Sequence, residues 1–275
     1  MRFVKTALII NALVLAGSVH AANPFFAMDT AVRNLGELDT VQQLGYDGIG
    51  WKTGPPEQLV AAAQQLRQRG LKLFAIYAGA TLTKSNLTWS SEVEADMVAL
   101  KGTDTIIWLP ITSKDFPASS PAGDAIAGPA LRRLADFAAT NGLRVAIYPH
   151  RGFWVERVQD AVRIAKQVNR KNLGVTFNLC HCLMAGDEAK IPELLTDAAP
   201  HLFLVTINGA DRNAAGTDWS RLIRPLDEGS YDVGLVLQKL KELHYTGPIG
   251  LQAFGVKLPV KDNLTRSMSA WRKLN

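Results

Sequence analysis

Short apolar runs alternate with longer amphipathic segments along nearly the whole chain. The apolar runs predict strands at 25–28, 46–51, 71–77, 105–111, 144–148, 175–179, 202–207 and 248–254. Apolar residues at spacings of three and four predict helices at 35–44, 55–69, 91–100, 125–140, 155–168, 188–198, 233–243 and 261–273. Eight strand–helix units in about 250 residues predict a closed (β/α)8 TIM barrel. An open doubly wound sheet is the alternative, but no G-x-G-x-x-G motif follows a strand.

One strand–helix–strand unit, residues 144–181, carries the clearest functional signal. Its first strand ends in the polar cluster 149–152, and its second ends at Cys180 and His181. A helical crossover joins parallel strands, so both strands finish on the same side of the sheet. We therefore expect His150, Asn178 and His181 to lie close together in the folded chain.

Alternation along the predicted strands identifies the side chains that face the barrel interior. The inward set comprises Ala146, Tyr148, His150, Thr176, Asn178, Thr206, Asn208, Gly250 and Gln252. The late positions of four neighbouring strands are thus polar, where a barrel built only for stability would usually carry aliphatic residues. Buried amides and hydroxyls cost free energy unless they are hydrogen-bonded. The pattern favours a solvated pocket with a polar ligand at the C-terminal strand ends.

The N-terminus has the features of a secretory signal peptide, predicted to cover residues 1–21. Arg2 and Lys5 precede an apolar stretch at 6–17, and 19–21 suit a cleavage site. The barrel would then occupy 22–275 as a single domain, in a bacterial periplasm or outside the cell. A retained membrane anchor is the alternative, although the apolar stretch is too short to span a bilayer.

The charge pattern gives no sign of a polyanionic partner. The 275-residue chain carries a formal charge of +5, and no run of five like charges occurs in it. We expect no binding to nucleic acid, and no membrane association after removal of the signal.

Several motifs resemble the xylose-isomerase-like TIM barrel superfamily, which includes sugar and sugar-phosphate isomerases and epimerases and the AP endonuclease 2 family. The matching stretches are GYDGI at 45–49, YPHRG at 148–152, NLGV at 172–175, NLCH at 178–181 and GPIGLQ at 247–252. The resemblance implies a divalent metal held by two glutamates, an aspartate and a histidine at the ends of strands five to eight. It also implies that the two glutamates exchange protons with the sugar.

This chain departs from the family pattern at every one of those ligand positions. Tyr148, Asn178, Thr206 and Gln252 stand in place of the ligands, and Gly50 replaces a glutamate frequent on strand two. Hard divalent ions prefer anionic oxygen ligands, so the usual Mg²⁺ or Mn²⁺ site should be lost or very weak. His150 and His181, which match histidines of the family pattern, remain, and Zn²⁺ held by both with help from Gln252 or water stays open.

The residues that remain suit proton transfer next to a carbonyl group. His150 and His181 are candidate catalytic acid and base groups, and Tyr148 is a candidate donor to a developing oxyanion. Substrate-binding candidates are Asn178, Asn208, Gln252, Thr206, Trp51, Trp154 and Arg151, with the tryptophans as stacking surfaces. No certain cofactor follows from this set.

The expected function is that of a secreted isomerase or epimerase acting on a free sugar or glycoside. A lyase or hydratase acting on 3-keto-glycosides and a non-catalytic carbohydrate-binding barrel are the alternatives. The partner is in each case a small carbohydrate. Homo-oligomerisation, which is common among the proteins that the chain resembles, stays open.

Overall fold

Eight parallel strands close into a barrel, as predicted. The computed structural model describes residues 23–216 and 218–275, so the predicted signal peptide lies outside the described residues. The barrel strands are β1 (Phe25–Ala27), β2 (Gly48–Lys52), β3 (Lys72–Tyr77), β6 (Ile106–Leu109), β8 (Arg144–Ile147), β9 (Leu173–Asn178), β10 (Leu202–Ile207) and β11 (Ile249–Leu251). Their order around the ring is β1-β11-β10-β9-β8-β6-β3-β2. Neighbours are parallel throughout, so all strand C-termini lie at one mouth.

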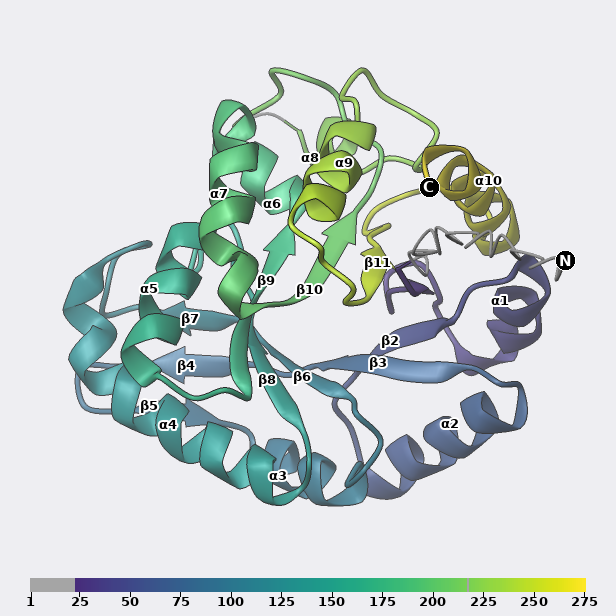
Figure 1. Ribbon diagram of the computed structural model, residues 1–275. Helices are drawn as coiled ribbons and strands as arrows, with labels where there is room; N and C mark the ends of the chain where they lie inside the picture. Colours follow the sequence, from purple (N-terminus) through teal and green to yellow (C-terminus); the bar gives the residue numbers. More distant parts are fainter. Residues whose placement is uncertain (1–22, 217) are drawn as a thin grey trace, which may run out of the picture.

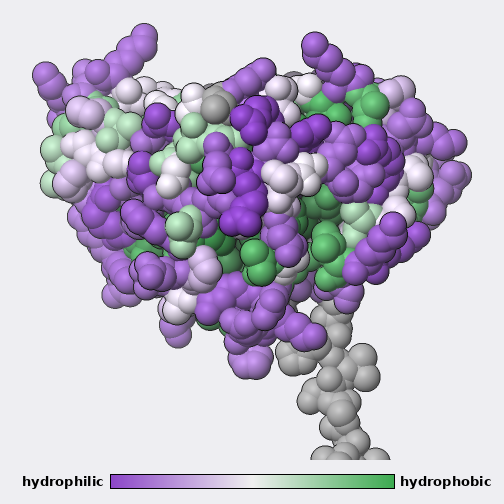
Figure 2. All heavy atoms as spheres, turned by 90° about the horizontal axis from the view of Figure 1, so that it is seen from above, coloured by the Kyte–Doolittle hydropathy of each residue, from purple (hydrophilic) through white to green (hydrophobic). Residues whose placement is uncertain are grey.

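Helices surround the strands, as Figure 1 shows. They are α1 (Leu38–Leu44), α2 (Pro56–Gln68), α3 (Ser91–Ala99), α4 (Asp124–Thr140), α5 (Val158–Val168), α6 (Leu179–Met184), α7 (Ile191–Ala198), α8 (Trp219–Leu222), α9 (Gly234–Glu242) and α10 (Val260–Leu274). Short 3-10 turns occupy Leu35–Glu37, Pro121–Gly123, Glu188–Lys190 and Ala199–His201. Among the helices described, none combines the length and apolar character needed to cross a bilayer. Seen from above in Figure 2, hydrophilic residues cover most of the surface, with small hydrophobic groups between them.

Several details differ from the expected elements: helices α6 and α8 were not expected, and β11 is shorter than the predicted strand 248–254. A three-stranded sheet of β4 (Ala80–Leu82), β5 (Leu87–Trp89) and β7 (Ile111–Ser113) extends beyond β3 and β6 at the mouth. The predicted strand 105–111 is therefore two strands, β6 and β7, interrupted at Pro110, which has no N–H to donate. The predicted strand 175–179 ends one residue earlier, because Asn178 caps helix α6 by accepting the His181 backbone N–H at 3.3 Å.

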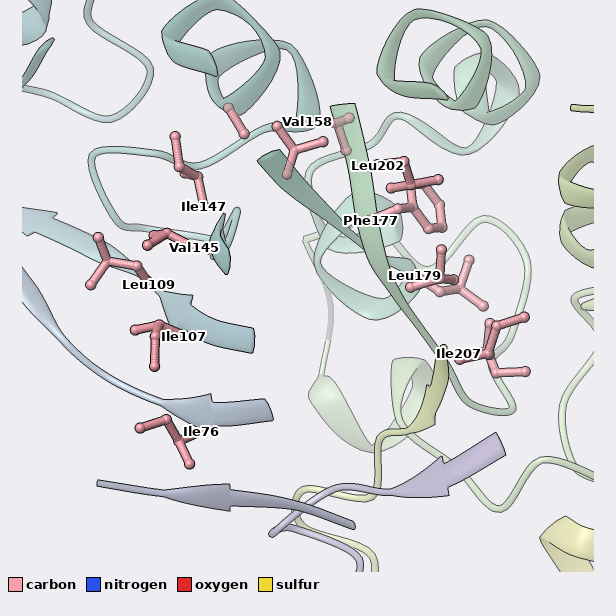
Figure 3. Packing of buried hydrophobic residues seen from close by; sticks show 14 of the residues in the cluster. Ile76, Ile107, Leu109, Val145, Ile147, Val158, Phe177, Leu179, Leu202 and Ile207 are labelled. Carbon is pink, nitrogen blue, oxygen red and sulfur yellow. The ribbon is translucent and has the colours of Figure 1, made fainter. Parts of the chain in front are cut away.

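The strand alternation divides the core into two layers. Val145, Ile147, Phe177 and other outward side chains pack with the helices, and Figure 3 shows Ile147 close to Val158 of α5. The barrel interior is filled by Phe26, Met28, Ala75, Ile106, Trp108, Ala146, Tyr148 and Leu204. The inward phase predicted for Ala146 and Tyr148 is thereby confirmed.

Three large aromatic side chains, Phe26, Trp108 and Tyr148, lie among the aliphatic residues inside the barrel, and glycines make room for Phe26. A Cβ on Gly250 would lie 2.5 Å from the Phe26 ring, so no larger residue fits there without displacing that ring. A Cβ on Gly50, where the family has its strand-two glutamate, would lie 3.2 Å from the same ring. Phe26 thus fills the space next to the position of the missing carboxylate.

Candidate active site

A cavity of about 440 Å³ opens at the C-terminal mouth of the barrel. Its wall is formed by Met28, Asp29, Thr30, Tyr77, Tyr148, His150, Arg151, His181, Trp219, Ile223, Gln252 and Phe254. These residues come from the ends of β1, β3, β8 and β11, from the start of α6, and from the segment after β10. Catalytic groups in TIM barrels are built from the same strand ends.

His150 and His181, about thirty residues apart in sequence, form the centre of the site. Their ring centroids are 4.0 Å apart, and Tyr148 lies edge-on to both rings, at 5.9 Å from His150 and 5.6 Å from His181. Phe153 stacks on the outer face of His150 at 3.9 Å, and Trp219 meets His181 edge-on at 5.1 Å. The close approach that the sequence predicts for the strand-five and strand-six ends is therefore present.

The backbone of Arg151 gives the two imidazoles opposite hydrogen-bonding roles. The Arg151 N–H donates to Nδ1 of His181 at 3.3 Å, so a neutral His181 carries its proton on Nε2 and acts as a donor. His150 Nδ1 lies 3.0 Å from the Arg151 carbonyl oxygen, which can only accept, so Nδ1 carries the proton and Nε2 keeps a lone pair. One ring is thus set as a proton donor and its neighbour as a proton acceptor.

Both imidazoles are held in the neutral state. Burial lowers the pKa of His150, and the hydrogen bond to the Arg151 carbonyl only partly offsets this. Burial lowers the pKa of His181 well below its usual value, and the positive charge that His150 can take up lowers it further. At neutral pH the pair is therefore uncharged, as the assigned donor and acceptor roles require.

Tyr148 is fully buried, and its hydroxyl takes part in a network of neutral groups. The Asn178 side-chain amide donates to the Tyr148 hydroxyl at 2.6 Å, and the Cys180 thiol donates to Asn178 Oδ1 at 3.0 Å. Burial raises the Tyr148 pKa well above its ordinary value, and the Cys180 thiol also raises it. The phenol is therefore protonated. Its oxygen is hydrogen-bonded by the side chains of Asn178 and Gln252, so its own O–H is the group left to donate.

Gln252 presents its amide nitrogen rather than its oxygen. Its Oε1 already accepts from the Thr30 hydroxyl at 2.6 Å and from the backbone N–H groups of Ala253 and Phe254 at 2.9 and 3.0 Å. The amide NH₂ group donates one hydrogen bond to the Tyr148 hydroxyl and has a second hydrogen left to donate. Gln252 and Tyr148 therefore act as neutral donors on the cavity wall.

These contacts do not fit the divalent metal that the family resemblance implies. Of the four replaced ligands, Tyr148 and Asn178 are bonded to each other, Gln252 Oε1 is saturated, and Thr206 is enclosed in the barrel with no hydrogen-bond partner among the described residues. His181 cannot ligate through Nε2 while Nδ1 accepts the Arg151 N–H. Within residues 23–216 and 218–275, no group of three or more His, Cys, Asp or Glu side chains could hold a metal ion.

The remaining predicted site residues lie in different places. Asn178 and Thr206 are buried beneath the cavity, and Asn208 is buried with its amide donating to the carbonyls of Gly209 and Leu222. Trp51 packs on the outer core, outside the cavity wall. Trp154 is fully buried and donates to the Ser120 carbonyl at 2.8 Å, so it offers no stacking surface there. Arg151 lines the cavity but pairs with Glu156.

The sequence interpretation missed Asp29, Tyr77, Trp219 and Phe254. Asp29 and Tyr77 directly follow or end predicted strands, so the strand-end rule that identified His150 could have found both. Asp29 also gives the site a carboxylate, although none stands at the four replaced ligand positions. Trp219 begins the short helix α8, which the sequence pattern did not predict, and Phe254 lies at the end of the predicted strand 248–254, three residues beyond the end of β11. Phe254 remains 64% exposed at the rim.

The depressed histidine pKa values predict loss of stability in acid. The unfolded chain binds a proton near pH 6.5 and the folded His181 only at lower pH, so the free energy of unfolding falls as pH drops below about 6.5. We expect a His181→Gln variant to lose less stability than the wild type between pH 7.5 and pH 5, measured by urea unfolding. His201→Gln, at a more exposed histidine, is the control and should change this difference less. Parallel pH profiles for wild type and His181→Gln would contradict the assignment.

Comparison with known proteins agrees with the architecture. Residues 38–274 match the family described as xylose isomerase-like TIM barrel. An uncharacterized protein of Methanocaldococcus jannaschii is 28% identical over 134 residues, which are 48% of this chain and 44% of the relative. The chain thus spans less than half the length of the curated relative that it matches.

Solved structures of similar fold cover nearly the whole chain. The zinc-bound IOLI protein superposes with a TM-score of 0.72 at 18% identity, covering 91% of this chain and 97% of the other. The 3-keto-D-glucoside 4-epimerase YcjR from E. coli superposes with a TM-score of 0.69 at 16% identity, covering 92% of this chain and 100% of the other. At these identities the structures establish the fold alone. The family match over residues 38–274 shows that the chain belongs to the xylose isomerase-like TIM barrel family.

Proposed function

We propose that this protein is a carbohydrate isomerase or epimerase that moves a proton next to a carbonyl group without a bound divalent metal. The observation that carries the proposal is the neutral imidazole pair. Two rings with centroids 4.0 Å apart, set by one backbone segment as acceptor and donor, border the same cavity as a protonated phenol. General acid–base groups and oxyanion donors are the parts that such a reaction needs.

The reaction follows from these roles. The lone pair of His150 Nε2 takes the proton from the carbon adjacent to the carbonyl. The C–H electron pair forms the new C=C bond, and the carbonyl π electrons move to oxygen, giving an enediolate. The Tyr148 O–H and the His181 Nε2–H stabilise this oxygen by hydrogen bonding. The proton on His150 exchanges with solvent, and delivery of a solvent proton to carbon, with collapse of the enediolate to a carbonyl, completes the exchange.

The charge of the cavity supports a substrate without phosphate. Among the described residues that line it, Arg151 is the only lysine or arginine, and its guanidinium is paired with the buried Glu156 carboxylate. The wall instead offers the rings of Tyr77, Trp219 and Phe254. Aromatic walls with a few neutral hydrogen-bonding groups suit the apolar faces and hydroxyls of a free sugar or glycoside.

The expected site of action is outside the cytoplasm. The predicted signal at residues 1–21 supports export to a periplasm or the medium, where sugar phosphates would be unusual. Fractionation of cells that express the full chain, with N-terminal sequencing of the product, tests this part. Cleavage near residue 21 is the expected result, and an intact cytoplasmic chain would contradict it.

Solvent deuterium exchange tests the proposed reaction before the product is known. The protein is incubated in D₂O with D-fructose, D-allulose, a methyl 3-keto-glucoside and its C4 epimer, and proton NMR follows the C–H signals next to the carbonyl. We expect loss of such a signal with at least one sugar, and a much slower loss of the signal whose proton His150 removes in a His150→Gln/His181→Gln variant. Ultraviolet absorption from an unsaturated product would indicate elimination instead. Binding without exchange by the wild type would identify a carbohydrate-binding barrel and overturn the proposal.

A further inference from the structure

Asp29 and His150 stand on opposite sides of the barrel mouth. In the ring order β1-β11-β10-β9-β8-β6-β3-β2, β1 and β8 are four places apart in a ring of eight, so they face each other across the barrel axis. Asp29 follows the end of β1 by two residues, and His150 follows the end of β8 by three. Both side chains line the same cavity. A ligand in this cavity would therefore have a carboxylate on one side and an imidazole on the other.

Asp29 has the properties of a reactive carboxylate rather than of a structural ion pair. Burial raises its pKa, and this effect is larger than the opposing influence of the Thr30 backbone N–H and the Lys52 charge. Its charge also contributes to the raised pKa values of Tyr77 and Tyr148, which border the cavity with it. An incompletely neutralised carboxylate in a partly buried site costs stability, and such groups concentrate where they have a function.

We propose that Asp29 and His150 are two catalytic bases that address opposite faces of the same substrate carbon, so that the enzyme inverts the configuration there. The inference rests on the proposed function and narrows it from proton transfer in general to epimerisation. It also identifies the carboxylate that takes over from the strand-five and strand-eight glutamates of the family, from a strand that does not carry those ligands.

Proton transfer can start from either epimer. From one epimer, the Asp29 carboxylate takes the proton, the C–H pair becomes the C=C bond of an enediolate, and the Tyr148 O–H stabilises the negatively charged oxygen. A His150 ring that has taken up a proton from solvent, the minor state at neutral pH because burial lowers its pKa, then delivers that proton to the opposite face as the enediolate collapses. From the other epimer the roles reverse. Each turnover leaves one base protonated and the other free, and solvent restores the starting state.

Single-base variants test this assignment because they separate exchange from inversion. With Asp29→Asn, the epimer whose proton faces His150 should still exchange with D₂O, while the other should lose exchange by at least about 100-fold. His150→Gln should show the reverse preference for the same pair. Interconversion of the epimers should fall by at least about 100-fold in both variants. The probes are the two epimer pairs named above: D-fructose with D-allulose, and the methyl 3-keto-glucoside with its C4 epimer.

The possible outcomes separate failure of the proposed function from failure of the two-base assignment. If the wild type exchanges none of the four sugars, the proposed function fails, and this inference with it. If the wild type exchanges an epimer pair but Asp29→Asn affects both epimers equally or neither, the two-base assignment alone is overturned. Asp29→Ser provides a second variant without the carboxylate, should Asp29→Asn fold poorly. Asp39→Asn, an exposed carboxylate on α1, is the matched control and should leave both rates unchanged.

Discussion

Replacing Tyr148 with phenylalanine is expected to slow proton transfer by about 10²–10³-fold, the range seen when one oxyanion donor is removed. The variant keeps the ring that packs against Trp108 at 4.6 Å between centroids and removes only the hydroxyl. The expected loss lies in the rate of the chemical step rather than in substrate binding, because the developing negative charge on the substrate oxygen needs this donor most in the transition state. Single-turnover deuterium exchange measures that step.

Tyr77→Phe is the matched control for this experiment. Tyr77 borders the same cavity and meets Tyr148 edge-on at 5.6 Å, but its hydroxyl has no assigned part in the reaction. We expect this variant to change the rate by no more than a few-fold. Equal losses in both variants would mean that the effect comes from cavity shape or packing, and would contradict the role of the Tyr148 hydroxyl.

Trp108→Ala is expected to lower the free energy of unfolding by about 3–5 kcal/mol. Trp108 is fully buried at the centre of the barrel interior and contacts Tyr148, and its indole N–H donates to the Thr176 hydroxyl at 2.6 Å. The substitution leaves a large cavity and removes the partner of a buried hydroxyl. Urea unfolding at pH 7.5 measures the loss.

Trp89→Ala provides the comparison for the stability measurement. Trp89 ends β5 in the small outer sheet, is only partly buried, and donates to the exposed Glu94 at 3.2 Å. Its removal should cost clearly less than that of Trp108. Equal losses of unfolding free energy in the two variants would mean that Trp108 in the barrel interior stabilises the fold no more than Trp89 in the outer sheet.

Hydrophobic periodicity was enough to predict the barrel. Each barrel strand and most helices bury the apolar residues that their local sequence pattern places on one face. It also predicted which side chains of β8 face the barrel interior, because successive side chains of a strand point to opposite faces. The small sheet of β4, β5 and β7 escaped prediction. Its three strands are each three residues long, too short for an alternating pattern, and β7 continues the apolar run of β6 across Pro110.

The site was predicted in part, and the reason for each success or failure is physical. His150 and His181 come together because a helical crossover between parallel strands fixes both strand ends on one side. The alternation does not show how deep in the barrel a side chain lies. Thr206, Asn178 and Gln252 all occupy inward positions, but only Gln252 reaches the cavity wall. Asp29 was not predicted because the ligand positions of the family lie on strands five to eight. Asp29 follows β1, which faces β8 across the ring.

The central claim is that the imidazole pair and Asp29, rather than a divalent ion, move the proton in this barrel. The most direct test is the deuterium exchange rate of the purified protein before and after dialysis against EDTA, with metal content measured in parallel. We expect an unchanged deuterium exchange rate and less than one equivalent of bound metal, and no increase in that rate on addition of Mn²⁺ or Zn²⁺. Loss of exchange on dialysis, restored by one equivalent of either ion, would contradict it.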